Sequence, residues 1–195
     1  MKPNKYKNKY RIATTRADWH DYNLGAYFVT VCTHDRKHYF GDIYKSQMIF
    51  SDIGKYADEQ FLRVTDHYKY AQIPLWVIMP NHIHAIIYIT DPPVETMCTS
   101  SRNNMCTSSI RWKGDVVDDK MQMISHKRGK LSTVVGGLKR AITHYANENN
   151  IVFMWQQRFH EHIIRNQNEL ERISKYIENN IAKWPYDRFY TNFGR

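Results

Sequence analysis

Two apolar segments joined by a short turn constrain the fold of this chain more than any other feature. Residues 73–79 and 82–90 are rich in β-branched and aromatic side chains, which favour strands. Pro80 and Asn81, which lie between the two segments, are residues typical of turns. The sequence therefore predicts a β-hairpin in which these two strands pair.

Three polar residues mark the expected starts of helices. Ser51 precedes apolar residues at steps of three and four, which predicts an amphipathic helix to about Val64. Ser132 precedes a second apolar stripe of helical spacing. Asn166 precedes a third stripe, with a glutamate at the capping-box position, and we expect Pro185 to end that helix.

The remaining extended segments complete the predicted order of elements. Residues 25–33 form a β-branched and aromatic run, and residues 152–155 and 158–164 also favour extended structure. The order is therefore strand, helix, strand, strand, helix, strand, helix. This order predicts an α+β fold, an antiparallel sheet with helices packed on one face, as in the ferredoxin and RRM folds.

The length of 195 residues suits a single domain spanning residues 1–195 with two less regular segments. Residues 1–20 carry six basic side chains and one acidic one, which predicts a basic arm. Residues 91–130 are polar, weakly periodic and contain an eight-residue repeat, which predicts a flexible insertion.

The composition limits which classes of binding partner and which cellular compartment the sequence fits. The formal net charge of +9 favours a polyphosphate partner such as a nucleic acid. No apolar run approaches the roughly 18 residues of a membrane helix, so we expect no membrane partner. Three cysteines are too few for a disulfide framework, and a reducing cytoplasm fits them best.

His82 and His84 are candidate metal ligands. Side chains alternate along a strand, so these two imidazoles project from one face while Ile83 turns to the other. Two imidazoles on a rigid strand make half of a divalent-metal site, and we expect solvent to reach them. The alternative is a pair of structural histidines hydrogen-bonded at the sheet surface.

Tyr176 and Asn180 are the candidates that complete such a site. They are four residues apart on the last predicted helix and therefore share one helical face, beside the apolar stripe. A tyrosine next to an amide oxygen combines a nucleophile with a third ligand. The alternative for Tyr176 is a residue at the boundary of the core.

Several motifs extend this pattern over most of the chain. They are Gly25-Ala26-Tyr27-Phe28-Val29-Thr30, Thr33 with Arg36, Trp76-Val77-Ile78-Met79-Pro80-Asn81-His82-Ile83-His84, Trp155-Gln156, Glu161-His162-Ile163-Ile164-Arg165-Asn166, and Tyr176-Ile177 with Asn180. Together they resemble the HUH single-tyrosine transposases, in particular the REP-associated tyrosine transposases. Ile181 departs from that family, which usually has proline after the asparagine.

The resemblance implies a transposase that cleaves and rejoins single-stranded DNA through a 5′-phosphotyrosine. Tyr176 would be the nucleophile, and His82, His84 and Asn180 would hold Mg²⁺ or Mn²⁺. The DNA partner implied is a single strand with a hairpin, and the protein would act as a monomer or a homodimer.

Four basic residues are the expected DNA contacts: Arg36, Lys139, Arg140 and Arg165. We expect Lys139 and Arg140 to lie near the cleft that holds Tyr176. The run His160-Glu161-His162 is interpreted as structural or as facing DNA, because its middle residue is charged.

Two other classes of function fit parts of the same sequence. A metal-dependent nuclease would use His82 and His84 with an activated water in place of a tyrosine. An RRM-like module would bind nucleic acid through aromatic side chains on the sheet without catalysis. A covalent adduct between protein and DNA distinguishes the transposase from both.

Overall fold

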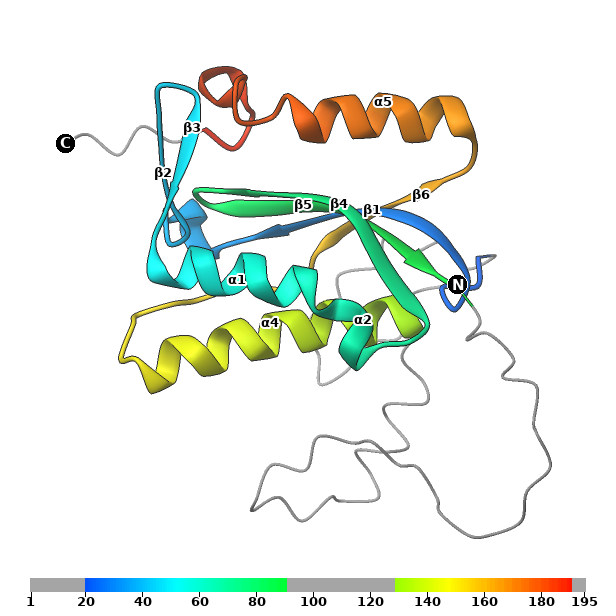
Figure 1. The fold of residues 1–195 in the computed structure, drawn as a ribbon, viewed down its shortest axis with the longest axis horizontal. Coiled ribbons are helices and arrows are strands. Elements are labelled where there is room, and N and C mark those ends of the chain that lie inside the picture. The colour runs from blue at the N-terminus through cyan, green and yellow to red at the C-terminus, as the bar shows by residue number, and fades with distance from the viewer. Residues whose placement is uncertain (1–19, 91–128, 191–195) are drawn as a thin grey trace, which may run out of the picture.

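The computed structural model describes residues 20–90 and 129–190, which form a four-stranded sheet with helices on both faces (Figure 1). Every neighbouring pair of strands is antiparallel. The order across the sheet is β4-β5-β1-β6, formed by β4 Ala71–Met79, β5 His82–Ile89, β1 Gly25–Cys32 and β6 His160–Ile164. The predicted hairpin and the α+β class with an antiparallel sheet are confirmed.

Within residues 20–90 and 129–190, four helices and a small two-stranded ribbon surround this sheet. They are α1 Asp52–Leu62, α2 Val64–His67, α4 Lys130–Glu148, α5 Gln167–Glu178, the ribbon of β2 Gly41–Tyr44 and β3 Gln47–Phe50, and the 3-10 turns η1 His34–Arg36 and η2 Trp184–Tyr186.

Two predicted helix caps are confirmed. The Ser51 hydroxyl accepts a hydrogen bond from the Gly54 N–H at 3.2 Å, and the Asn166 side chain accepts one from the Glu169 N–H at 2.9 Å.

Three local features differ from the sequence analysis. Helix α4 begins at Lys130, so Ser132 lies inside the first turn and is not the cap. Helix α5 ends at Glu178, well before Pro185, and a series of turns then leads to Trp184, which is buried in the core on the α5 side of the sheet. The β2–β3 turn was missed because its central residues are Lys45 and Ser46, which adopt positive φ without the usual glycine or asparagine.

The sheet separates two cores of unequal size. Helices α1 and α4 lie together on one face and cover the larger core, whereas α5 lies on the opposite face (Figure 1). The expected placement on one face therefore holds for α1 and α4 and not for α5. The reason is strand alternation: Val77, Met79 and Ile86 point away from the larger core, and Ile173 and Ile177 of α5 are buried against them.

Nearly all of the predicted basic arm (1–20) and insertion (91–130) falls on residues 1–19 and 91–128, which lie outside the described ranges. The insertion was predicted to extend too far, because Lys130 already belongs to α4. Among the helices of residues 20–90 and 129–190, none is long and apolar enough to cross a membrane.

Candidate active site

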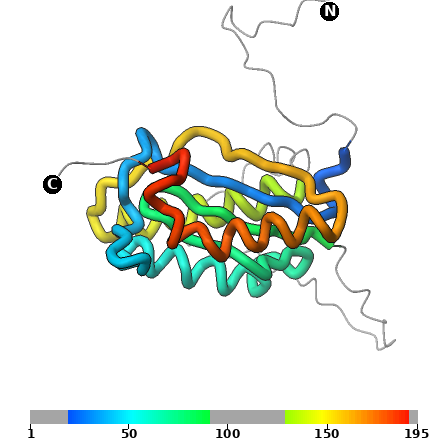
Figure 2. Tube along the Cα trace, turned by 90° about the horizontal axis from the view of Figure 1, so that it is seen from above, coloured from blue at the N-terminus to red at the C-terminus, as the bar shows by residue number. Residues whose placement is uncertain are grey.

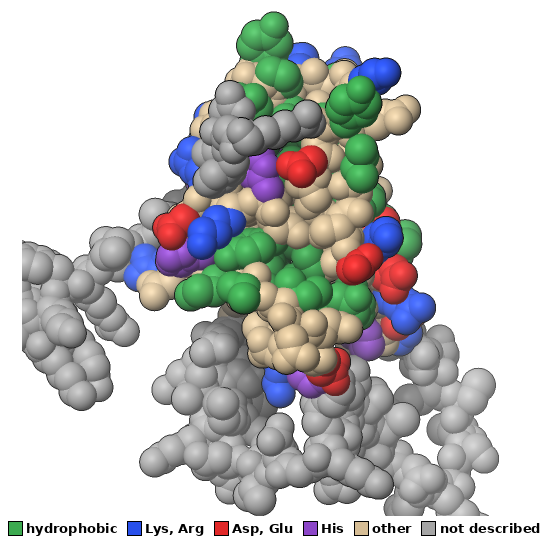
Figure 3. Space-filling model, turned by 90° about the vertical axis from the view of Figure 1, so that its left-hand side faces the viewer, with side chains coloured by type: hydrophobic (Ala, Val, Ile, Leu, Met, Phe, Trp, Pro, Cys, Tyr) green, Lys and Arg blue, Asp and Glu red, His purple; other side chains and the backbone are tan. Residues whose placement is uncertain are grey.

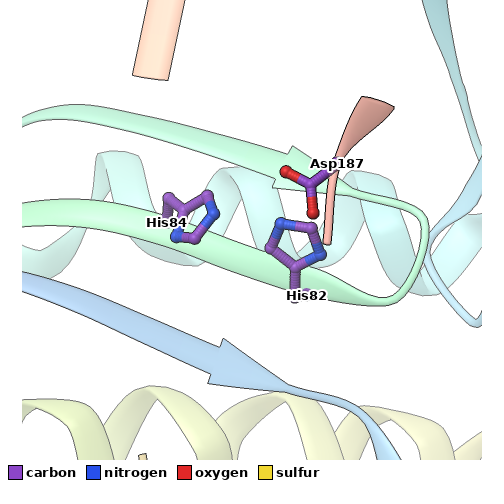
Figure 4. A group of neighbouring side chains, drawn as sticks. All are labelled: His82, His84 and Asp187. Atoms are coloured by element: carbon purple, nitrogen blue, oxygen red, sulfur yellow. The ribbon is translucent and has the colours of Figure 1, made fainter. Parts of the chain in front are cut away.

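Strand β5 presents His82 and His84 to the face that α5 covers (Figure 4). Their ring centroids are 4.5 Å apart, and both side chains are buried, with exposed fractions of 0% and 1%. The expectation that solvent reaches them is wrong. The ring of Phe189, from the C-terminal segment, packs over His82 with a centroid distance of 4.6 Å, and Trp184 lies beside it.

Asn81 fixes the orientation of the His82 ring. Its side-chain nitrogen donates to the carbonyl oxygens of Phe189 at 2.8 Å and Arg36 at 3.2 Å. Because both partners are acceptors, the amide oxygen must face His82, where it lies 2.8 Å from Nδ1 and accepts its hydrogen. This arrangement leaves the lone pair on Nε2 of His82, a buried atom without a partner.

His84 is held in a comparable way by the neighbouring strand. Its Nδ1 lies 2.8 Å from the Thr30 hydroxyl, and its Nε2 lies 3.2 Å from the Tyr176 hydroxyl. Burial, followed by the charge of Arg188, lowers the pKa of His84 to about 3. Burial also holds the pKa of His82 well below its ordinary value. Both rings are therefore neutral at physiological pH and keep a lone pair for a metal.

Tyr176 reaches from α5 to this histidine pair and remains partly exposed, at 42%. Its hydroxyl donates toward Oδ2 of Asp187 at 3.4 Å. Burial raises the pKa of Tyr176, and the Asp187 carboxylate raises it further. The hydroxyl therefore keeps its proton at neutral pH, and the carboxylate beside it is positioned to receive that proton.

The donor atoms around this point fit a divalent cation. Ligand atoms of His82, His84 and Asp187 all lie within 4.8 Å of one another. The side-chain oxygen of Asn180 is buried and without a partner, as is Nε2 of His82. Such atoms are costly to bury unless something satisfies them. Imidazole nitrogens together with amide or carboxylate oxygens are ligands that suit Mn²⁺ and related metals.

Sequence reasoning missed Asp187. It lies more than a hundred residues from the His82 strand, in the irregular segment after Pro185, and no spacing rule connects the two. Oδ1 of Asp187 accepts the Phe189 N–H at 2.7 Å, so a local turn sets the direction of the carboxylate. Figure 4 shows Asp187 above His82.

A groove of about 530 Å³ opens beside Tyr176. Its lining comes from three strands, α5 and the C-terminal segment, and consists of Phe28, Thr30, His84, His160, His162, Arg172, Ile173, Tyr176 and Arg188. The His160-Glu161-His162 run, interpreted from sequence as structural or facing DNA, thus contributes both histidines to the groove.

The predicted DNA contacts lie on different sides of the molecule. Arg36 lies at the candidate site, where its guanidinium is 5.1 Å from the centroid of the Phe189 ring and donates to the Arg188 carbonyl at 3.1 Å. Arg165 is exposed in the short turn between β6 and α5.

Lys139 and Arg140 are not near the cleft that holds Tyr176. Both lie on α4, which covers the opposite face of the sheet. The Lys139 ammonium donates to the carbonyls of Gln156 at 3.0 Å and Arg158 at 3.2 Å, so it ties α4 to the segment before β6.

Figure 3 views the end of the molecule that lies at the left in Figure 1. On the described surface seen there, Lys and Arg side chains stand apart around hydrophobic side chains and do not merge into one patch. Net charge alone therefore does not mark a binding surface at this end, and the groove beside Tyr176 is the more specific feature.

No protein-family model matches the chain. A protein of Haemophilus influenzae, described only as uncharacterized, is 28% identical over 169 residues, which cover 86% of each chain. The solved structure of a REP-associated tyrosine transposase bound to a REP hairpin is similar with a TM-score of 0.54 and 18% sequence identity. That similarity covers 91% of this chain and 77% of the other.

The chain has the fold of a REP-associated tyrosine transposase. The resemblance to REP-associated tyrosine transposases that the motifs carry is thus confirmed at the level of the fold. The similarity extends over both described ranges, which bring His82, His84 and Tyr176 together at one point.

Proposed function

We propose that this chain is a transposase that cleaves and rejoins single-stranded DNA through a covalent 5′-phosphotyrosine on Tyr176. One observation carries the proposal: the Tyr176 hydroxyl lies 3.2 Å from Nε2 of His84 and 3.4 Å from Oδ2 of Asp187. A nucleophile, a carboxylate and a neutral histidine pair therefore meet beside the groove that Tyr176 and His84 line.

The reaction needs no outside energy source, because one bond to phosphorus forms as another breaks. The phenol oxygen of Tyr176 attacks a backbone phosphorus, and its proton passes to Oδ2 of Asp187. The bond from phosphorus to the 3′ oxygen breaks, and that oxygen leaves as a hydroxyl after taking a proton from solvent. The phosphotyrosine conserves the energy of the phosphodiester, so a 3′-hydroxyl can attack it and restore the DNA.

His82, His84 and Asn180 would hold a divalent cation, Mg²⁺ or Mn²⁺. The buried atoms of His82 and Asn180 that have no partner support this ligand set. Bound there, the cation would polarise the scissile phosphate and stabilise the charge of the transition state. We assign Asp187 the role of proton acceptor, because its Oδ2 lies 3.4 Å from the Tyr176 hydroxyl.

Single-stranded DNA is the proposed substrate. The net charge of +9 favours a polyphosphate, and the groove volume suits a ligand of small-molecule size, which corresponds to a short stretch of one strand. The structural neighbour was solved with a REP hairpin. That finding supports a hairpin in the DNA that this chain binds.

A covalent-trapping experiment tests the proposal. The full-length protein is incubated with Mn²⁺ and a library of single-stranded, hairpin-bearing oligonucleotides labelled at the 3′ end, and the products are separated on a denaturing gel. We expect label to migrate with wild-type protein and not with Tyr176→Phe. Cleavage without any adduct would instead identify a hydrolytic nuclease.

A further inference from the structure

Helix α5 covers only part of its face of the sheet. It packs against β4 and β5, and Figure 2 shows it over that half, with β1 and the chain of β6 running beside it. The half formed by β1 and β6 is therefore left without a helix on this side. The groove beside Tyr176 lies over this uncovered half.

The pairing register places polar side chains in a row across the groove floor. Thr30 of β1 pairs with His84 on one side and with His160 on the other. Residues directly opposite each other in a sheet point to the same face, so the three side chains form one line. With strands about 4.8 Å apart, that line runs about 10 Å from His84 to His160.

The next row of the floor carries an aromatic ring. Phe28 pairs with His162, and its ring stacks on His84 at a centroid distance of 5.1 Å and meets Tyr176 edge-to-face at 6.1 Å. Ile173 of α5 adds an apolar wall. The groove thus offers an apolar surface immediately next to the hydroxyl of Tyr176.

The charged lining of the groove is basic. Arg172 and Arg188 are exposed and line it together with the two histidines of β6, and no carboxylate is among its lining residues in the described ranges. The nearby Glu169 accepts hydrogen bonds from His162 at 2.7 Å and from the Arg165 N–H at 3.0 Å, and its Oε1 also lies 3.7 Å from the Arg172 guanidinium. Arg172 is itself exposed, so its remaining N–H groups face the groove side open to a ligand. An anionic ligand is therefore favoured.

We propose that this uncovered half of the sheet is a subsite for the nucleotide that adjoins the cleaved phosphate on a single DNA strand. Arg172 and His160 donate to its phosphate, and its apolar part lies on Phe28. The inference rests on the proposed function, since it places the subsite relative to Tyr176. It adds the direction in which the strand leaves the nucleophile, across β1 toward β6.

Equilibrium binding of a fluorescein-labelled oligothymidine strand to full-length protein tests the subsite. The titrations contain a chelator, so that no cleavage occurs, and are repeated over a series of salt concentrations. Arg172→Gln is the main variant and Arg172→Lys is the rescue variant. Arg63→Gln is the matched control, because Arg63 is an exposed arginine that follows α1 on the other side of the sheet.

We expect Arg172→Gln to weaken binding about tenfold and to reduce the slope of log affinity against log salt by about 0.7. Arg172→Lys should keep the slope, and Arg63→Gln should change neither quantity. His160→Gln should weaken binding by a smaller factor. An unchanged slope in Arg172→Gln, or an equal loss in Arg63→Gln, overturns the subsite.

Three further outcomes are informative, and the last two separate this inference from the proposed function. Tighter binding of an oligouridine strand than of the oligothymidine strand would overturn the assignment to DNA. A wild-type protein that shows the predicted Arg172 effect but forms no covalent adduct would keep the subsite and refute the transposase. A covalent adduct with wild-type protein, together with unchanged DNA binding by Arg172→Gln, would support the transposase and refute the subsite.

Discussion

Replacement of Asn81 by leucine tests whether this side chain holds the candidate site together. Asn81 is fully buried and makes three side-chain hydrogen bonds, to His82, to the Phe189 carbonyl and to the Arg36 carbonyl. Leucine has a similar size and can make none of them. The variant therefore leaves the His82 Nδ1–H and two carbonyl groups without their partner.

The expected loss of stability follows from these groups. A buried polar group left unsatisfied costs about 1–3 kcal/mol, and the bonds to His82 and Phe189 are both buried. The gain from burying a leucine side chain, about 1.5–3 kcal/mol, offsets part of this. We therefore expect Asn81→Leu to lower the free energy of unfolding by about 2–4 kcal/mol, a large share of the total stability of a typical domain.

Urea unfolding followed by tryptophan fluorescence measures this difference, with Trp184 as a buried reporter next to His82. Asn147→Leu is the matched control, because Asn147 is exposed on α4 and its substitution should stay within about 0.5 kcal/mol. A loss below about 1 kcal/mol in Asn81→Leu would refute the role of Asn81 in fixing His82 and the C-terminal segment.

Three other predictions concern the site and its surroundings. His82→Gln should lower the affinity for Mn²⁺ by at least about tenfold in a calorimetric titration while the far-ultraviolet circular dichroism stays the same, because a buried ligand is lost and side-chain volume is kept. Asp187→Asn should keep Mn²⁺ affinity but slow adduct formation by about 10²–10⁴-fold, and a matching loss of affinity would make Asp187 a ligand. Hydrogen bonds from the Arg165 N–H and then His162 lower the pKa of Glu169, so its stabilising effect is complete above the ordinary glutamate pKa and is lost as pH falls through the lowered value. The difference in unfolding free energy between wild type and Glu169→Gln should therefore shrink from about pH 6 to about pH 3, and a constant difference would contradict this.

Local patterns predicted the parts of the fold that depend on neighbouring residues. The hairpin of β4 and β5 and the caps at Ser51 and Asn166 need only a few consecutive residues. The face on which α5 packs could not be read in this way. Strand β5 is buried on both faces, so apolar residues follow one another along it and the period of two that would reveal a second core is hidden.

The same distinction between local and long-range determinants applies to the residues of the candidate site. His82 and His84 share a face because of strand alternation, and Tyr176 follows from the helical stripe of α5. Asp187 depends on a fold-back of irregular chain, which no periodicity describes. The misplacement of Lys139 has the same origin, since its position relative to Tyr176 depends on which face of the sheet each helix covers.

Mapping the attachment site of trapped DNA tests the central claim most directly. The wild-type adduct is digested with nuclease and trypsin, and the nucleotide-bearing peptide is identified by mass spectrometry. The tryptic segment of residues 176–183 contains one tyrosine, Tyr176, so the assignment is unambiguous. We predict a phosphate-linked nucleotide on this segment through its 5′ end. Attachment to another tyrosine, or cleavage that leaves no modified peptide, would contradict the account.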